Sequence, residues 1–144
     1  MIEVQSSVLI DQPIEKVYDF VTTPENDAKW YLGIESRDHT PGEPPGVGST
    51  SQSDIRFLGV KMSVTWEVID YDRPYRIGVK TVEGPVLVKA GYNFEEVSPD
   101  QTKVTVHGEA DLEGIFDLAE PLVERMAQRQ WDASFENLKD VLED

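Results

Sequence analysis

The sequence predicts an α+β fold in which a seven-stranded antiparallel sheet wraps around one long C-terminal helix. Three observations support this prediction. Strand-like stretches alternate with turn residues from Tyr31 to about Leu112, a spacing typical of antiparallel sheets. One further strand-like stretch and two short helical patterns precede them, and a long amphipathic pattern covers 115–142. Since only this last helix is large enough to cover one face of the sheet, we expect the core to lie between the two.

The first 30 residues predict one strand and two short helices. Over 3–10, residues of one parity are mostly apolar, as in a strand that buries one face. Pro13 then begins a helix, in which apolar residues recur at helical spacing as far as Val21. Pro24 ends that helix, and a second, very short one is expected over 24–29.

Turn signals divide the middle of the chain into six more strands. These signals include Leu58-Gly59 and the Pro/Gly-rich stretch 41–46. Pro121 lies in the first two turns of the expected 115–142 helix, where it marks either a kink or the true start of the helix. With no repeat and no linker, the chain is expected to form one domain over 1–144. The six strands are expected at about 33–40, 48–57, 60–70, 75–83, 86–96 and 102–112.

Acidic residues outnumber basic ones by more than two to one. There are 28 Asp and Glu against 13 Lys and Arg, which gives a net charge of -15. Such a surface repels nucleic-acid phosphates and anionic lipid headgroups, so we expect no nucleic-acid partner. No apolar run reaches the roughly 18 residues of a membrane span, and no basic leader precedes an apolar block. The chain has no cysteine for disulfides or metal binding, and we expect a cytoplasmic location.

Four stretches carry a resemblance to a known superfamily. They are the strand-to-helix opening over 8–20, the Thr-Pro-Glu-Asn run over 23–26 followed by Trp30, the glycines of 46–49 and the Tyr-Asn-Phe-Glu run over 92–95. In order and spacing they resemble the START/birch-allergen-like helix-grip superfamily (SRPBCC), and most closely its polyketide cyclase/dehydrase-like proteins. The resemblance implies a hydrophobic pocket. It does not imply one chemistry, because members include lipid carriers, hormone receptors, cyclases and cochaperone domains.

Hairpin geometry selects the side chains that should face such a pocket. If Leu58-Gly59 is a two-residue turn, Ser53 pairs with Val64 and both point inward. A three-residue loop would instead turn Asp54 and Arg56 inward, and we favour the shorter turn. The same reasoning on the other strands and the long helix, with Trp30 added from the resemblance, gives the expected ligand-binding residues: Trp30, Ser51, Ser53, Ile55, Met62, Val64, Trp66, Ile77, Val79, Thr81, Val88, Ala90, Tyr92, Val106, Gly108, Leu122, Met126 and Gln130.

No catalytic residue is assigned among the polar residues near the expected pocket. Tyr92 is the candidate proton donor, and His39, at the Pro/Gly-rich loop, is a candidate acid or base. No inward carboxylate or histidine is placed to act as the base for Tyr92, which favours binding over catalysis. Gln130 is expected either to orient a ligand or to bond Tyr92. His39 and His107 have no HxH or HExxH spacing, so no metal and no cofactor are expected.

Three functional hypotheses follow from these residues and from the resemblance. The leading one is binding of a small hydrophobic or amphipathic ligand, lipid-like or polyketide-like, between the sheet and the long helix. The first alternative is an enzyme resembling polyketide cyclases or dehydratases, with acid–base chemistry in that cavity. The second is a protein-interaction module like the helix-grip cochaperones. We expect no membrane-spanning segment. The sequence leaves open whether the protein forms a homodimer.

The charge also leads to a hypothesis of adaptation to high salt. Like charges destabilise a compact state, and the screening length falls from about 10 Å at 0.1 M salt to about 3 Å at 1 M. We therefore expect the melting temperature to rise with KCl at pH 7 and to keep rising above about 0.5 M, with an uncharged osmolyte as the control. A rise that is complete below that concentration would indicate simple screening. A melting temperature that is flat or falls with KCl would contradict the hypothesis.

Overall fold

The computed structural model describes residues 1–112 and 118–144. The described residues form a seven-stranded antiparallel sheet in the order β1-β7-β6-β5-β4-β3-β2. The strands are β1 (Ile2–Ile10), β2 (Ile34–His39), β3 (Thr50–Phe57), β4 (Val60–Asp72), β5 (Arg76–Glu83), β6 (Leu87–Ser98) and β7 (Gln101–Asp111). The helices are α1 (Ile14–Thr22), the 3-10 turn η1 (Pro24–Asn26), α2 (Asp27–Trp30) and α3 (Glu120–Glu143).

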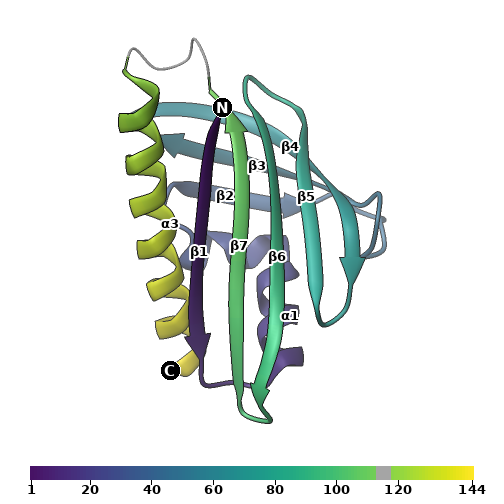
Figure 1. Ribbon diagram of the computed structural model, residues 1–144. Helices are drawn as coiled ribbons and strands as arrows, with labels where there is room; N and C mark the ends of the chain where they lie inside the picture. Colours follow the sequence, from purple (N-terminus) through teal and green to yellow (C-terminus); the bar gives the residue numbers. More distant parts are fainter. Residues whose placement is uncertain (113–117) are drawn as a thin grey trace.

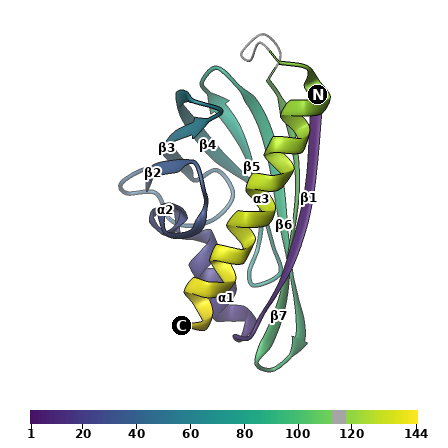
Figure 2. The ribbon, with the colours of Figure 1, turned by 90° about the vertical axis from the view of Figure 1, so that its left-hand side faces the viewer.

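The sheet curves around the long helix α3. Figure 1 shows α3 lying beside the edge strand β1, with the two chain ends at opposite ends of the molecule. Figure 2, turned by 90°, shows α3 crossing the concave side of the sheet, with α1 and α2 on the same side. The predicted helix-grip fold is confirmed. No helix in the described part of the chain is both long and apolar enough to cross a bilayer.

The hairpin between β3 and β4 has the predicted two-residue turn. Leu58 and Gly59 both have positive φ, 51° and 81°, as a type I′ turn requires. The register pairs Ser53 with Val64, and both side chains are buried. The three-residue alternative is wrong, since Asp54 instead accepts a hydrogen bond from an exposed serine hydroxyl on β4 at 2.7 Å.

The main hydrophobic core occupies one end of the space under α3. It joins β1, α1, α2 and the strands β5 to β7 to the second half of α3, where Phe135, Leu138 and Leu142 are buried. Tyr18 of α1 is fully buried in this core and donates a hydrogen bond to the Arg76 carbonyl at 2.9 Å. The first half of α3 buries smaller side chains, Val123 and Ala127, and thus fills less of the space above the sheet.

The backbone edge of β1 is bonded by side chains of α3. The Glu3 amide donates to the Glu124 carboxylate at 2.9 Å, and the Gln5 amide donates to Gln128 Oε1 at 3.1 Å. Gln128 Nε2 in turn donates to the Gln5 carbonyl at 2.7 Å, and Lys139 Nζ donates to a carbonyl further along β1 at 3.0 Å. An unpaired strand edge exposes a row of such groups. Here α3 side chains bond four of these groups, and the helix covers the sheet on that side.

The start and the rotation of α3 correct the sequence prediction. The helix begins at Glu120, so Pro121 marks its start and not a kink. Of the residues expected before that point, 115–117 lie outside the described part. The prediction that Leu122 and Met126 face the core is wrong, because they are 42% and 37% exposed. The row of α3 side chains bonded to β1 fixes the rotation of the helix, and this turns the neighbouring Val123 and Ala127 inward instead.

Candidate functional site

A cavity of about 130 Å³ lies between the sheet and the first half of α3. Most of its lining is apolar and comes from β1, from β3 to β7 and from α3. Ala90, Gly108, Ala110 and Ala127 are small residues on its walls, and their size leaves the space open. An apolar cavity of roughly 150 Å³ is enough to bind benzene, so this one has the size of a single ring.

Half of the expected ligand-binding set lines the cavity. Met62, Val79 and Ala90 are buried in its strand walls. Tyr92 and Trp66 contribute partly buried aromatic rings. The predicted residues that line the cavity are Ile55, Met62, Trp66, Val79, Val88, Ala90, Tyr92, Gly108 and Gln130.

The other predicted residues lie elsewhere. Trp30, Ile77 and Val106 belong to the main core, which borders the cavity and shares Val79 and Ala90 with its lining. Val64 packs in a separate cluster with Met62. The predicted residues that do not line the cavity are Trp30, Ser51, Ser53, Val64, Ile77, Thr81, Val106, Leu122 and Met126.

Three of these residues are buried hydroxyls with partners inside the protein. Ser51 Oγ accepts a hydrogen bond from Arg37 Nε at 3.0 Å, and Ser53 Oγ accepts one from Trp66 Nε1 at 2.8 Å. Thr81 Oγ1 donates to a backbone carbonyl at 3.0 Å. Buried polar groups need such partners. These hydroxyls therefore hold other side chains in place and do not open onto the cavity.

A buried ion pair lies at the cavity wall. Arg37 Nη1 of β2 donates to Asp27 Oδ2 of α2, and the two side chains are only 14% and 5% exposed. The guanidinium also lies 5.3 Å from the ring centre of Trp66, within cation–π range. Burial raises the pKa of Asp27, and the adjacent Arg37 opposes that rise. Because a guanidinium stays protonated, the direct contact with Arg37 favours the carboxylate form of Asp27.

Two tyrosines lie beside this ion pair. Tyr31 and Tyr92 both line the cavity, and neither hydroxyl has a hydrogen-bond partner in the described ranges. Burial, and after it the negative charge of Asp27, raises the pKa of both hydroxyls. They are therefore protonated at neutral pH and can donate to a molecule in the cavity. The ring of Trp131 packs edge-on against both, with centroids 4.5 Å and 6.0 Å away.

Gln130 lines the cavity but does not bond Tyr92, the protein partner expected for it. Its Nε2 donates to the Leu32 carbonyl, just before β2. Gly33, with a φ of 99°, follows directly, and a Cβ there would overlap the Gln130 amide. Gln130 thus ties α3 to the segment that carries Tyr31 and supports that wall of the cavity.

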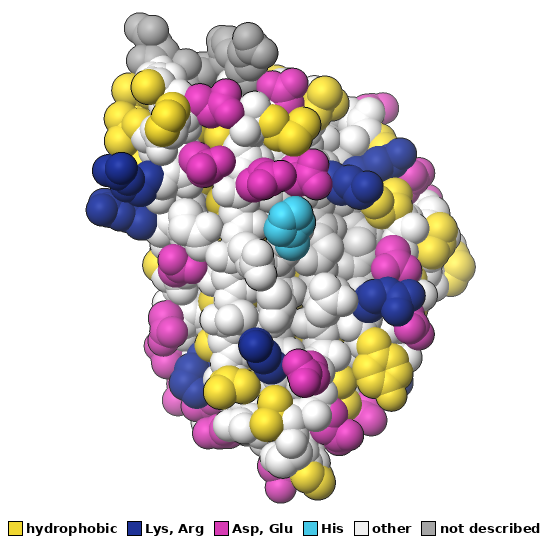
Figure 3. Space-filling model, in the orientation of Figure 1, with side chains coloured by type: hydrophobic (Ala, Val, Ile, Leu, Met, Phe, Trp, Pro, Cys, Tyr) yellow, Lys and Arg dark blue, Asp and Glu magenta, His cyan; other side chains and the backbone are white. Residues whose placement is uncertain are grey.

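The histidines lie away from the cavity. His39 Nδ1 and Glu25 Oε2 are 2.7 Å apart, and both side chains are exposed. His107 is exposed and pairs with Gln5 on the outer face of the sheet. That face carries scattered acids and bases with no single charged patch (Figure 3). The described residues contain no cluster of His, Cys, Asp or Glu that could hold a metal ion.

Sequence reasoning missed the polar wall of the cavity: Asp27, Tyr31, Arg37 and Trp131. The inward position of Arg37 follows from its pairing with Ser53, because the β3–β4 hairpin register places Ser53 on the inner face of the sheet. The long connection between β2 and β3 hid this register, and a bulge shifts it further. The prediction that no inward carboxylate is placed near Tyr92 is wrong, since Asp27 lines the same cavity.

Breaking the ion pair from one side should be costly. Arg37→Met leaves the Asp27 carboxylate buried without its counter-charge, and we expect the free energy of unfolding in urea to fall by about 3–5 kcal/mol. A second change, Asp27→Leu, removes the orphaned charge and should restore part of the loss. The control is Arg73→Met, which breaks an exposed pair with Asp19 and should cost far less. Equal losses for the two arginines would contradict the assignment.

Comparisons with known proteins agree with the fold. A family model described as polyketide cyclase / dehydrase and lipid transport matches residues 1–143. A search of curated proteins found no match.

Solved structures of similar fold span nearly the whole chain. A START superfamily protein from Mycobacterium smegmatis is 16% identical with a TM-score of 0.80, over 98% of this chain and 97% of that one. The Zhui aromatase/cyclase from Streptomyces sp. R1128 is 16% identical with a TM-score of 0.76, over 98% and 93%. Major latex-like protein 151 from Panax ginseng is 15% identical with a TM-score of 0.74, over 97% and 96%. The chain belongs to the polyketide cyclase / dehydrase and lipid transport family.

Proposed function

We propose that this protein binds a small hydrophobic or amphipathic molecule, one ring in size, in the cavity under α3. The observation that carries the proposal is the cavity itself: about 130 Å³ of open space with a mostly apolar lining and a few polar groups on one wall. Ligand sites commonly combine these two features. The family description, which includes lipid transport as well as cyclase and dehydrase, is consistent with such a ligand.

The polar wall supports a ligand with one polar end. The hydroxyls of Tyr31 and Tyr92 have no partner in the part of the chain that the structure describes, and they border the same cavity as the apolar strand residues. A molecule that is apolar along most of its length and carries one oxygen atom would satisfy both parts of the lining. A molecule that is apolar throughout would leave the hydroxyls unsatisfied.

An acid–base enzyme is the second candidate, and Asp27 is the observation that favours it. A carboxylate and two protonated tyrosines line one cavity, and aldol closure of a chain of ketones needs one group to take a proton and another to donate one. Against this role, Arg37 already occupies one oxygen of Asp27. The two candidates differ in the fate of a linear triketone, which a binding protein releases unchanged and a cyclase converts to an aromatic diol with loss of water.

Filling the cavity should abolish binding. Ala127→Phe places a ring inside the space, and we expect the binding of cumene (isopropylbenzene), measured by titration calorimetry, to fall at least about tenfold while the fold is retained. Ala133→Phe makes the same change on the exposed face of α3 and should leave binding unchanged. Cumene binding of equal strength in both variants would refute the proposal, and so would a failure of both cumene and its oxygen-bearing analogue acetophenone to bind the unmodified protein.

A further inference from the structure

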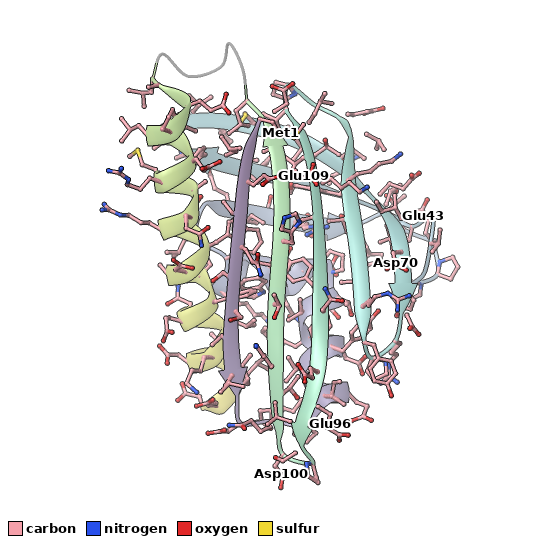
Figure 4. All side chains as sticks on the ribbon, in the orientation of Figure 1. Met1, Glu43, Asp70, Glu96, Asp100 and Glu109 are labelled. Atoms are coloured by element: carbon pink, nitrogen blue, oxygen red, sulfur yellow. The ribbon has the colours of Figure 1, made fainter. Side chains whose placement is uncertain are left out.

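The buried charged groups on the cavity wall have opposite charges that offset each other. Asp27 and Arg37 are both largely buried and in direct contact, so together they carry no net charge. Two further charged residues, Arg56 and Glu109, also line the cavity and are opposite in sign. Arg56 is paired with Glu35 and half exposed, and Glu109 lies near the Met1 end of the sheet (Figure 4). Water screens these outer charges, and the inner pair determines the charge that a ligand meets.

A charged ligand would disturb this balance. A carboxylate that approached Arg37 would also approach Asp27, and two buried like charges repel strongly. An ammonium group would meet Arg37 in the same way. Two of the five N–H groups of Arg37 are already used, one on Nη1 by Asp27 and the one on Nε by Ser51, and the contact with Asp27 offsets the charge that would attract an anion. Burying a charge without a partner costs a large amount of binding free energy.

An uncharged oxygen fits the same wall. The hydroxyls of Tyr31 and Tyr92 border the cavity with no partner in the described ranges, and a carbonyl oxygen can accept a hydrogen bond from either. We propose that Asp27 is a specificity-determining residue that, by neutralising Arg37, makes the cavity select uncharged, oxygen-bearing ring compounds over carboxylates. This inference rests on the proposed function, since it names the class of ligand that the same cavity takes.

Three probes of nearly equal size test the proposal: acetophenone, benzoate and cumene. Each carries a branched group of three non-hydrogen atoms on one benzene ring, planar in acetophenone and benzoate and tetrahedral in cumene, so the apolar contacts of the ring are matched. In the unmodified protein at pH 7, titration calorimetry should rank acetophenone about 2- to 10-fold above cumene, the range of one neutral hydrogen bond. Benzoate should bind at least about tenfold more weakly than acetophenone. Benzoate binding as tight as acetophenone binding would overturn the proposal without any variant.

The Asp27→Asn variant should reverse the selectivity. It keeps the shape of the side chain and leaves Arg37 with an uncompensated positive charge. Its affinity for benzoate should rise by about 10- to 100-fold, the range of a charge-assisted hydrogen bond, while its affinity for acetophenone changes less than about threefold. The matched control is Asp38→Asn, which removes the same charge from an exposed position beside Arg37 and should leave all three affinities unchanged.

The outcomes separate this inference from the proposed function. If cumene and acetophenone bind but benzoate is not disfavoured, or Asp27→Asn leaves benzoate unchanged, the role of Asp27 is wrong and the binding function stands. If no probe binds the unmodified protein, both are wrong. A thermal melt of each variant precedes the titrations. Should Asp27→Asn fail to fold, benzoate binding as tight as acetophenone binding by the unmodified protein still overturns the proposal.

Discussion

The attachment of α3 to the edge of β1 is the constraint on which the site depends. Glu124 and Gln128 bond backbone groups of β1, and Lys139 bonds the same strand nearer the other end of the helix. These contacts satisfy an edge that would otherwise be open. They also fix the rotation of α3 about its axis. The side chains on one flank of this polar row therefore face the sheet, and those on the other flank face the solvent.

The cavity follows from that rotation. The first half of α3 presents Val123 and Ala127 to the sheet, whereas the second half presents Phe135, Leu138 and Leu142. Large side chains fill the space at one end, and small ones leave it open at the other. Protein interiors are otherwise closely packed, so a gap of about 130 Å³ reflects the choice of residues on both walls. The aromatic contacts of Trp131 with Tyr31 and Tyr92 hold the polar wall of this gap in place.

The sequence predicts most of the fold and about half of the cavity lining. Strand alternation and the Leu58-Gly59 turn are local signals, and the β3–β4 register follows from them without any long-range information. The rotation of α3 is different, because it depends on contacts with a strand more than a hundred residues earlier. An amphipathic helix with apolar residues at both Leu122 and Val123 can face the core with either. The tertiary contact decides between them.

The polar wall could not be predicted for a related reason. Arg37 and Asp27 are charged residues in a strongly acidic chain, where a solvent-exposed position is the ordinary expectation. What buries them is the pairing of β2 with β3 across a ten-residue connection and the packing of α2 against α3. Neither contact leaves a periodic pattern in the sequence. The polar wall therefore depends on contacts between elements distant in the sequence, whereas the strands of the sheet are predictable from their local sequence patterns.

The most direct test of the ligand cavity is methyl NMR of the alanine-labelled protein with cumene added. The six alanines divide evenly: Ala90, Ala110 and Ala127 line the cavity, and Ala28, Ala119 and Ala133 do not. The ring current of bound cumene shifts methyl signals only over short distances, so only alanine methyl groups that line the cavity should change their chemical shifts. We expect saturable shifts of the first three signals and constant positions for the others. Shifts confined to Ala28, Ala119 or Ala133, or no saturable shift at all, would contradict the account.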